Sequence, residues 1–547
     1  VASGNGAGRS PSGSPLRRRA FCCISDRDLI SSKHMTAPEK KKSGIARPPL
    51  VGPSERLTVV YLVLLSAAAV FCFLPLLKYF FAQDDFILMN TALRDGLRSV
   101  TDFFSQTPGH FRPLTKGVYF GVMYRNFGLN PVPFHAVSII LHVVNMFLFF
   151  LLMRRVRVSV SSALVSSTLF ALSVAFFHVV AWISCVQQLL GQCFMLAAVI
   201  WGIDYIRSGV ARDKWLSVAA YILALLCVEQ TFGVPVILLL YAYLSPGAER
   251  ARPAFRKTVD QLSMHLGIMI LYLVFIGVWK RAPSTGDYAF SYGVNVLVNF
   301  TTYVGWTLHF AAVLPTRMAT GSVVWSISHV ILALLVVYHV ARGRWREVVF
   351  GLFYFVVTIA PTLFLTNHTF YLHTYIPAFG VLYWVALFVD DVFSLRLLYN
   401  RRARLAVLAA VLVGTTAACG MMIRKNEHYD MLEDIDLKRS FVLRRAEIAE
   451  NIFKGVAGEK SVDTDAQKVY MVYAREEGNN TAHWNYKNVV AATGRGSLIN
   501  LIYERPQMPV TFKVTGDPVK RSDRHISDFY LFDDYGHCWG MKVSGED

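Results

Sequence analysis

The chain has few charged residues for its length, and its cysteines form no framework. Only 17% of the 547 residues are Asp, Glu, Lys or Arg, whereas 54% are hydrophobic. This composition excludes a soluble protein of that size and indicates an integral membrane protein. The eight cysteines are scattered and follow neither a disulfide pattern nor a zinc-ligand spacing. The sequence also lacks the matching halves that are typical of many transporters.

The charge that is present is mostly positive, with a formal net charge of +18. Such a balance can indicate a nucleic-acid-binding protein, but here Lys and Arg form short clusters between apolar segments. Clusters of this kind are typical of the cytoplasmic loops of membrane proteins. We therefore predict contact with membrane lipids and no binding of nucleic acid.

The apolar segments are 57–81, 134–153, 160–177, 186–205, 215–228, 232–244, 262–279, 294–314, 323–340, 348–364, 371–389 and 405–423. With a cytoplasmic N-terminus, the basic clusters of the first half alternate as expected, with each on the inner side. The later clusters, at 342–346 and 396–404, fall inside only if segment 294–314 stays on the outer face. We therefore predict a re-entrant or interfacial element within 283–321, about eleven spans and a C-terminus outside.

The composition divides the chain into three parts. Residues 1–55 are rich in Gly, Ser, Pro and basic residues, which predicts a disordered basic cytoplasmic tail. Residues 56–423 form a transmembrane domain whose first outer loop is 82–133. For residues 424–547 the apolar pattern predicts a small periplasmic α/β domain. Its expected elements are an amphipathic helix at 431–456 and strands at 468–474, 497–504, 510–514 and 529–532.

Two adjacent carboxylates, Asp84 and Asp85, stand where the first apolar segment ends. Acidic residues are costly at the mouth of a membrane helix, so this position indicates a site of chemistry. The alternative is that one of them only caps the helix that follows. The same loop carries His110, Arg112 and Lys116, a combination that suits transfer from an anionic lipid carrier. One Asp would act as general base on an acceptor hydroxyl, while Arg112 and Lys116 bind the donor phosphate.

Several of the polar residues allow a second interpretation. Arg112 and Lys116 can instead contact lipid headgroups. Glu229 lies between two short apolar stretches, where it is either a second acidic site residue or the buried partner of an Arg or His. Tyr371 and His373 begin a segment at the outer face, and we expect them, with Glu229 and His110, to line the cavity.

A metal ion is not required by this arrangement. A divalent ion could bridge the carboxylates and the carrier phosphate, but Arg112 and Lys116 can neutralise the phosphate without one. We predict no cofactor. Further along, 533–538 contains two Asp, a His and a Cys, and this stretch is better interpreted as a turn after a strand than as a metal site.

Several short motifs in order resemble the C-type membrane glycosyltransferases, in particular the bacterial relatives of the protein O-mannosyltransferases with tetratricopeptide repeats. They are Asp84-Asp85-Phe86, Phe111-Arg112-Pro113-Leu114-Thr115, Phe127-Gly128-Leu129-Asn130-Pro131, His178-Val179-Val180-Ala181-Trp182-Ile183 and Tyr371-Leu372-His373-Thr374-Tyr375-Ile376-Pro377. The resemblance implies a polyprenyl- or dolichyl-phosphate sugar donor, an inverting transfer outside the cytoplasm, and a catalytic Asp at Asp84 or Asp85. No repeat of about 34 residues is present, and Cys227-Val228-Glu229-Gln230 stands where related chains tend to have a Lys-Glu pair.

We therefore predict a polytopic α-helical glycosyltransferase of a bacterial inner membrane. Its donor would be a polyprenyl-phosphate sugar, and its acceptor a glycan, a lipid or a protein. The alternatives are an oligosaccharide polymerase or ligase and a transporter of lipid-linked glycans. A polymerase typically depends on a large outer loop in the second half of the chain, whereas here the long acidic loop is the first one.

Overall fold

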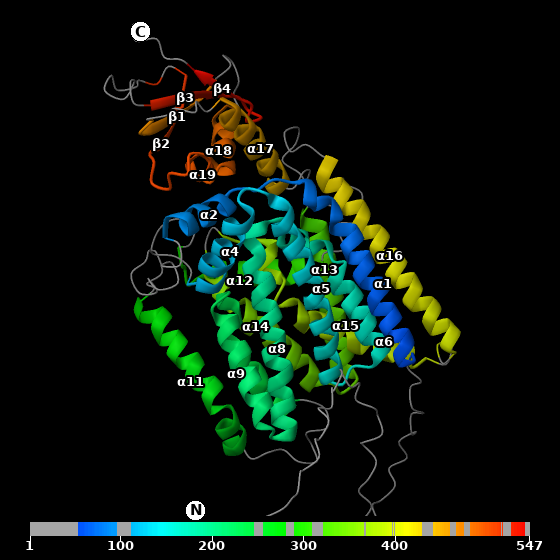
Figure 1. Ribbon diagram of the computed structural model, residues 1–547. Helices are drawn as coiled ribbons and strands as arrows, with labels where there is room; N and C mark the ends of the chain where they lie inside the picture. The colour runs from blue at the N-terminus through cyan, green and yellow to red at the C-terminus, as the bar shows by residue number, and fades with distance from the viewer. Residues whose placement is uncertain are drawn as a thin grey trace, which may run out of the picture. The chain divides into compact units, whose positions relative to one another are not determined.

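The computed structural model describes residues 53–95, 111–244, 255–279, 289–308, 321–365, 368–395, 398, 400–428, 441–459, 466–474, 482–515, 517 and 527–541 (Figure 1). Nearly all of the predicted tail 1–55 lies outside these residues, and so does His110. The predicted element 283–321 is described only in part.

Most of the described chain is helical, and six helical stretches are long and apolar enough to cross a membrane. They comprise α1 (Glu55–Phe73) with the turn η2 (Leu74–Lys78), α5 (Pro131–Arg155), η5 (Ile183–Cys185) with α8 (Val186–Ser208), α11 (Phe255–Trp279), α14 (Trp345–Leu363) and α16 (Arg401–His428). A seventh candidate, bent by 44°, consists of α6 (Val160–Ala171) with η4 (Val174–Phe176) and α7 (Phe177–Ala181). The protein is thus a multi-pass membrane protein, as predicted, while the number of about eleven spans stays a prediction.

The first part of the described chain contains further helices. They are α2 (Asp84–Asp95), η3 (Leu114–Tyr119), α4 (Phe120–Phe127), α9 (Ala211–Leu225), η6 (Glu229–Gly233), α10 (Val234–Leu244), α12 (Val294–Thr307), α13 (Gly321–Ala341), η10 (Tyr371–Thr374) and α15 (Ala378–Phe393). The 14 residues of α12 rise by about 21 Å, which is less than the ~30 Å of a bilayer core. The re-entrant or interfacial element that we place here stays a prediction.

Local sequence signals explain where the long helices begin and end. The helix α5 starts at Pro131 because Asn130 caps it, accepting the Val132 N–H at 3.1 Å. At its other end Arg155 pairs with Asp204 of α8 at 2.7 Å. The hairpin between α8 and α9 turns at Gly209. Its φ of 70° lies in the left-handed region, which glycine adopts readily because it has no side chain. Basic residues therefore gather at one end of this helix pair.

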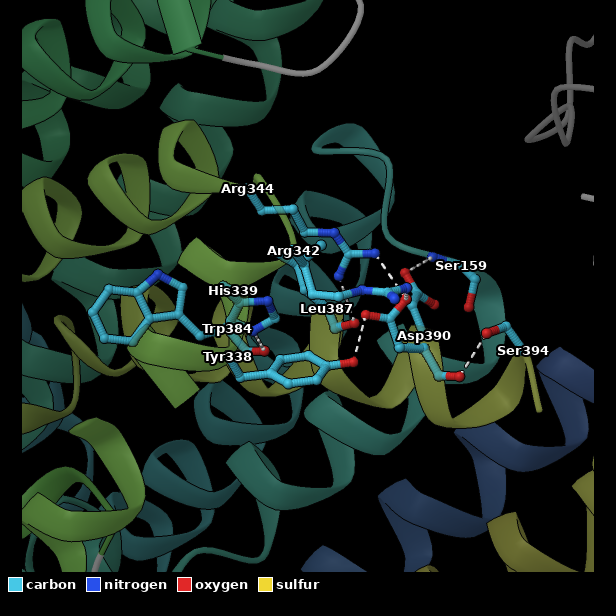
Figure 2. Close-up of polar contacts among 10 residues, drawn as sticks. Ser159, Tyr338, His339, Arg342, Arg344, Trp384, Leu387, Asp390 and Ser394 are labelled. Carbon is cyan, nitrogen blue, oxygen red and sulfur yellow. Dashed lines mark hydrogen bonds and ion pairs between the residues drawn. The ribbon is translucent and has the colours of Figure 1, made fainter. Parts of the chain in front are cut away.

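A second basic cluster is held at that same end. Figure 2 shows Arg344 directed toward α15, where its Nη2 lies 2.8 Å from Asp391 Oδ1. The neighbouring Asp390 accepts the Ser159 N–H at 3.4 Å, and Ser159 caps α6 just after the cluster at 154–157. The clusters 154–157 and 342–346 therefore lie at one end of the helical bundle, which is the arrangement that the predicted topology requires.

The C-terminal part is an α/β domain, as predicted. It consists of α17 (Phe441–Glu459), β1 (Lys468–Tyr473), α18 (Ala482–Ala492), α19 (Ser497–Ile502), β2 (Val510–Val514), β3 (Ser527–Phe532) and β4 (Cys538–Met541). The strand order is β2-β1-β3-β4, in which β1 is parallel to both neighbours and β4 is antiparallel to β3. The strand predicted at 497–504 was wrong. That stretch forms α19, because its apolar side chains pack beneath the sheet and against α2 instead of extending the sheet.

The C-terminal domain and α2 share one hydrophobic core, which includes Phe86, Met89, Ile452 and Ile499. The backbone adds to this contact, because the Gln83 N–H donates to the Ala492 carbonyl at 3.0 Å. The helix α2 is therefore the platform on which this domain rests (Figure 1).

Candidate active site

The two predicted carboxylates begin α2, and the structure gives them different surroundings. Asp85 is 2% exposed. Its Oδ2 accepts the Ala82 N–H at 2.9 Å, and its Oδ1 accepts the Ser184 N–H at 2.7 Å and the Ser184 hydroxyl. Burial raises the pKa of Asp85 to about 7, although these hydrogen bonds act in the opposite direction. Asp85 thus ties the start of α2 to η5.

Asp84, in contrast, has an exposed side chain. Protein atoms nevertheless crowd it, and this loss of solvation raises the pKa of its carboxyl group above the ordinary value. Four cations act in the opposite direction and favour the carboxylate: Lys116, Arg495, Arg445 and Arg112. Asp84 is therefore a reachable carboxylate in a positively charged setting, which is what a general base beside a phosphate requires.

Arg112 and Glu229 form a close ion pair. The Arg112 Nη2 lies 2.7 Å from Glu229 Oε2, and its Nε lies 2.9 Å from the same oxygen and 3.2 Å from Oε1. Their side chains are only 10% and 18% exposed. Of the two readings of Glu229, the structure shows the partner of an arginine.

Lys116 lies on an unusual turn. Residues Leu114–Tyr119 form a single stretch of π-helix, and the Lys116 N–H donates to the Arg112 carbonyl at 2.9 Å. Short π-helical stretches are rare, and many of those known lie at functional sites. The turn keeps Lys116 close to Arg112, and the charges of both act on Asp84. Their role as donor-phosphate residues stays a prediction.

The late motif joins this region through aromatic contacts. Tyr371 stacks on Trp306 with ring centroids 4.0 Å apart, and its ring lies 6.5 Å from that of His178. His373 is buried, and its carbonyl accepts the Gln230 amide at 2.9 Å, one residue from Glu229. Tyr371 and His373 are therefore connected to the Glu229 side of the site, although no described contact joins them to Asp84.

Sequence reasoning expected the C-terminal domain to cover or extend the acceptor site, but it singled out none of that domain's residues. Arg445 of α17 and Arg495, between α18 and α19, both act on the charge of Asp84. It also missed Ser184, the partner of Asp85. Nothing in the sequence signals these pairings, because each joins segments that are far apart along the chain.

No candidate metal centre is found in the described ranges, in the sense of three or more His, Cys, Asp or Glu residues placed to hold an ion. The stretch at 533–538 forms a turn, as predicted. Asp533 Oδ1 accepts the N–H groups of Tyr535 and His537 at 2.9 and 2.8 Å, and its Oδ2 lies 2.8 Å from His537 Nδ1.

No protein-family model and no curated protein matches the sequence. Solved structures are similar at 12–14% identity. The oligosaccharyltransferase of Archaeoglobus fulgidus, with a tethered acceptor peptide, aligns with a TM-score of 0.44 and 14% identity over 81% of this chain and 64% of its own. The arabinofuranosyltransferase AftD from Mycobacteria aligns with a TM-score of 0.39 and 14% identity over 77% of this chain and 30% of its own. ArnT from Cupriavidus metallidurans, bound to undecaprenyl phosphate, aligns with a TM-score of 0.47 and 13% identity over 88% of this chain and 94% of its own.

All three are C-type glycosyltransferases. The chain spans less than two-thirds of the oligosaccharyltransferase and less than one-third of AftD. The narrower resemblance to the tetratricopeptide branch stays a prediction.

Proposed function

We propose that this protein is a membrane glycosyltransferase that moves a sugar from a polyprenyl-phosphate carrier to an acceptor hydroxyl, with inversion. The observation that carries this proposal is Asp84, an exposed carboxylate that starts α2 and on which the charges of four cations act. A base and a cluster of cations are the two elements that this transfer needs.

The chemistry assigns a role to each side of the site. The acceptor oxygen attacks C1 of the sugar and forms the new glycosidic bond, while the bond between C1 and the carrier phosphate oxygen breaks. Asp84 takes the proton of the hydroxyl, and the phosphate leaves with the bonding electron pair. The negative charge that develops on the phosphate is stabilised by Lys116 and Arg112.

Asp84 is the better general base of the two carboxylates. Both oxygens of Asp85 already accept hydrogen bonds from the protein, and its side chain is closed to an acceptor. Asp85 instead positions the start of α2, and thereby Asp84. The site lies at the end of α1 opposite Ser54, which Arg401 of the basic cluster 396–404 contacts at 3.5 Å. With basic clusters inside, this supports a reaction on the extracytoplasmic side. The bacterial inner membrane is part of the proposal.

The test is transfer of labelled sugar from a panel of polyprenyl-phosphate donors into membrane extracts. Wild-type protein is compared with Asp84→Asn and Asp85→Asn at matched expression. We expect transfer by the wild type, and its loss in Asp84→Asn. Transfer that survives both substitutions would remove the acidic pair from the mechanism, and the absence of transfer from every donor would favour the polymerase or the transporter.

A further inference from the structure

Two arginines of the C-terminal domain lie within electrostatic reach of Asp84. Arg445 is near the start of α17, and Arg495 is in the turn that joins α18 to α19. The membrane domain supplies the other two cations around this carboxylate, Lys116 and Arg112. Both domains therefore supply cations whose charge acts on Asp84.

The turn that carries Arg495 is fixed against the start of α2. Gly494 has a φ of 59°, and a Cβ at this position would lie only 2.6 Å from the Gln83 carbonyl oxygen. Arg495 itself has a φ of 57°, and its N–H donates to the Val490 carbonyl at 2.9 Å. Its side chain is exposed. The backbone is thus held in a left-handed turn that presents an arginine beside Asp84.

Arg445 is positioned by a different set of contacts. Its Nη2 donates to Asn488 Oδ1 of α18 at 3.1 Å, and its guanidinium lies 5.5 Å from the centroid of the Phe441 ring. The Phe441 ring in turn lies 5.4 Å from the ring of His178 in α7 and 5.8 Å from that of Trp182, which follows α7. Arg445 is therefore positioned by Asn488 and Phe441, and Phe441 is the residue that contacts the aromatic residues of the membrane domain.

One donor of Arg445 remains unused by the protein. Its Nε is buried and has no hydrogen-bond partner in the described part of the chain. A buried N–H of a charged group that lacks an acceptor is costly, and a ligand oxygen would satisfy it. Arg112, by comparison, already gives its Nε and Nη2 to Glu229. The charge of Arg112 is therefore partly neutralised, and an anion at this site needs further cations.

We propose that Arg445 and Arg495 bind the phosphate of the lipid carrier, so that the C-terminal domain forms one wall of the phosphate site. This inference rests on the proposed function and adds two residues to it. The phosphodiester of the donor becomes a phosphomonoester when the bond to C1 breaks, so its negative charge increases. Arginines suit this anion because their planar guanidinium groups can donate two hydrogen bonds to one phosphate.

The test measures binding rather than transfer. The full-length protein, in lipid nanodiscs, is titrated with undecaprenyl phosphate and, separately, with uncharged undecaprenol. We expect Arg445→Gln and Arg495→Gln each to weaken binding of undecaprenyl phosphate by about tenfold, the effect of one lost charged hydrogen bond, and to leave undecaprenol unchanged. Arg445→Lys should recover part of the binding. Lys454→Gln is the matched control, because Lys454 belongs to the same helix as Arg445 but pairs with Glu450 at 2.7 Å on the exposed face.

The outcomes separate this inference from the proposed function. Equal binding of undecaprenyl phosphate and undecaprenol by the wild type would overturn the proposed donor class, and the inference with it. If Arg112→Gln and Lys116→Gln weaken phosphate binding while the two C-terminal variants do not, only the inference is wrong. Should Arg445→Gln lower binding of both lipids, it has disturbed the fold, and the exposed Arg495 then decides the question.

Discussion

Arg112 and Glu229 join the first outer loop to the turn η6 through one ion pair. Three donor-acceptor contacts of 2.7 to 3.2 Å connect the two side chains. The Leu114 N–H also donates to the Leu226 carbonyl at 3.2 Å, so the backbone holds the same two segments together. The pair therefore fixes Arg112 near Asp84 and reduces its charge at the same time.

The first prediction concerns this ion pair. Glu229→Gln and Arg112→Gln should each lower the thermal unfolding temperature, because each removes an ion pair from a mostly buried charge. The double variant should lose less than the sum of the two, with a coupling energy of about 1–3 kcal/mol in a double-mutant cycle. A cycle between Arg112 and Asp204, which pairs with Arg155 elsewhere, is the control and should be additive. Additive losses for Arg112 and Glu229 would contradict the prediction.

The second prediction separates the two carboxylates. Asp84→Asn should lower sugar transfer by roughly 10²–10⁴-fold and leave the thermal unfolding temperature unchanged, since the residue is exposed. Asp85→Asn should lower the unfolding temperature. Asn has only one acceptor oxygen, so its NH₂ group, a donor, would face one of the two N–H groups, of Ala82 and Ser184, that donate to Asp85. Transfer and unfolding are measured on the same preparations. The reversed pattern would make Asp85 the base.

The third prediction is a shift in pH dependence. A general base must be deprotonated, so transfer should rise with pH through the pKa of Asp84, above the ordinary value of about 4. Lys116 is the cation that lowers this pKa most. Its removal in Lys116→Gln should raise the pKa further and move the acidic limb of kcat/KM to higher pH. Lys454→Gln should not move it. A limb that stays where it is in Lys116→Gln, as in Lys454→Gln, would show that Lys116 does not act on the base.

The fold was predictable from the sequence to the extent that each feature is local. In a membrane the backbone polar groups of a long apolar segment must be hydrogen-bonded within the segment, which favours a helix. Asp84 and Asp85 stood out because acidic residues are costly at the end of a membrane helix. The stretch 497–504 was assigned wrongly because a short apolar segment fits a strand or a buried helix equally well. Packing against α2 decides between them.

The candidate site was predictable only in part, because its pairings join distant segments. Glu229 was recognised as a costly carboxylate, but its sequence context is equally suited to a site residue and to a buried partner. Only the structure shows that Glu229 forms an ion pair with Arg112. The sequence around Arg445 and Arg495 does not mark them as site residues, since nothing in it distinguishes them from other arginines of the C-terminal domain. Their relation to Asp84 arises from the contact between that domain and α2.

The last prediction tests that contact. Gly494→Ala should loosen the C-terminal domain from α2, because the new Cβ would lie 2.6 Å from the Gln83 carbonyl oxygen. The left-handed backbone of Gly494 adds a cost of about 1–2 kcal/mol for any residue with a side chain. Gly209→Ala is the matched control. Gly209 also has a left-handed φ, of 70°, but a Cβ there has open space around it.

Both glycine variants should therefore lose stability through the left-handed backbone, but only one of them should loosen the C-terminal domain from α2. Both should lower the thermal unfolding temperature. Only Gly494→Ala should increase hydrogen exchange in α18 and α19 and weaken the binding of undecaprenyl phosphate, because only it separates Arg445 and Arg495 from Asp84. If Gly494→Ala increases exchange in these helices and still binds the phosphate normally, the C-terminal domain rests on α2 for stability alone. In that case the cations of the membrane domain, Lys116 and Arg112, hold the carrier without its help.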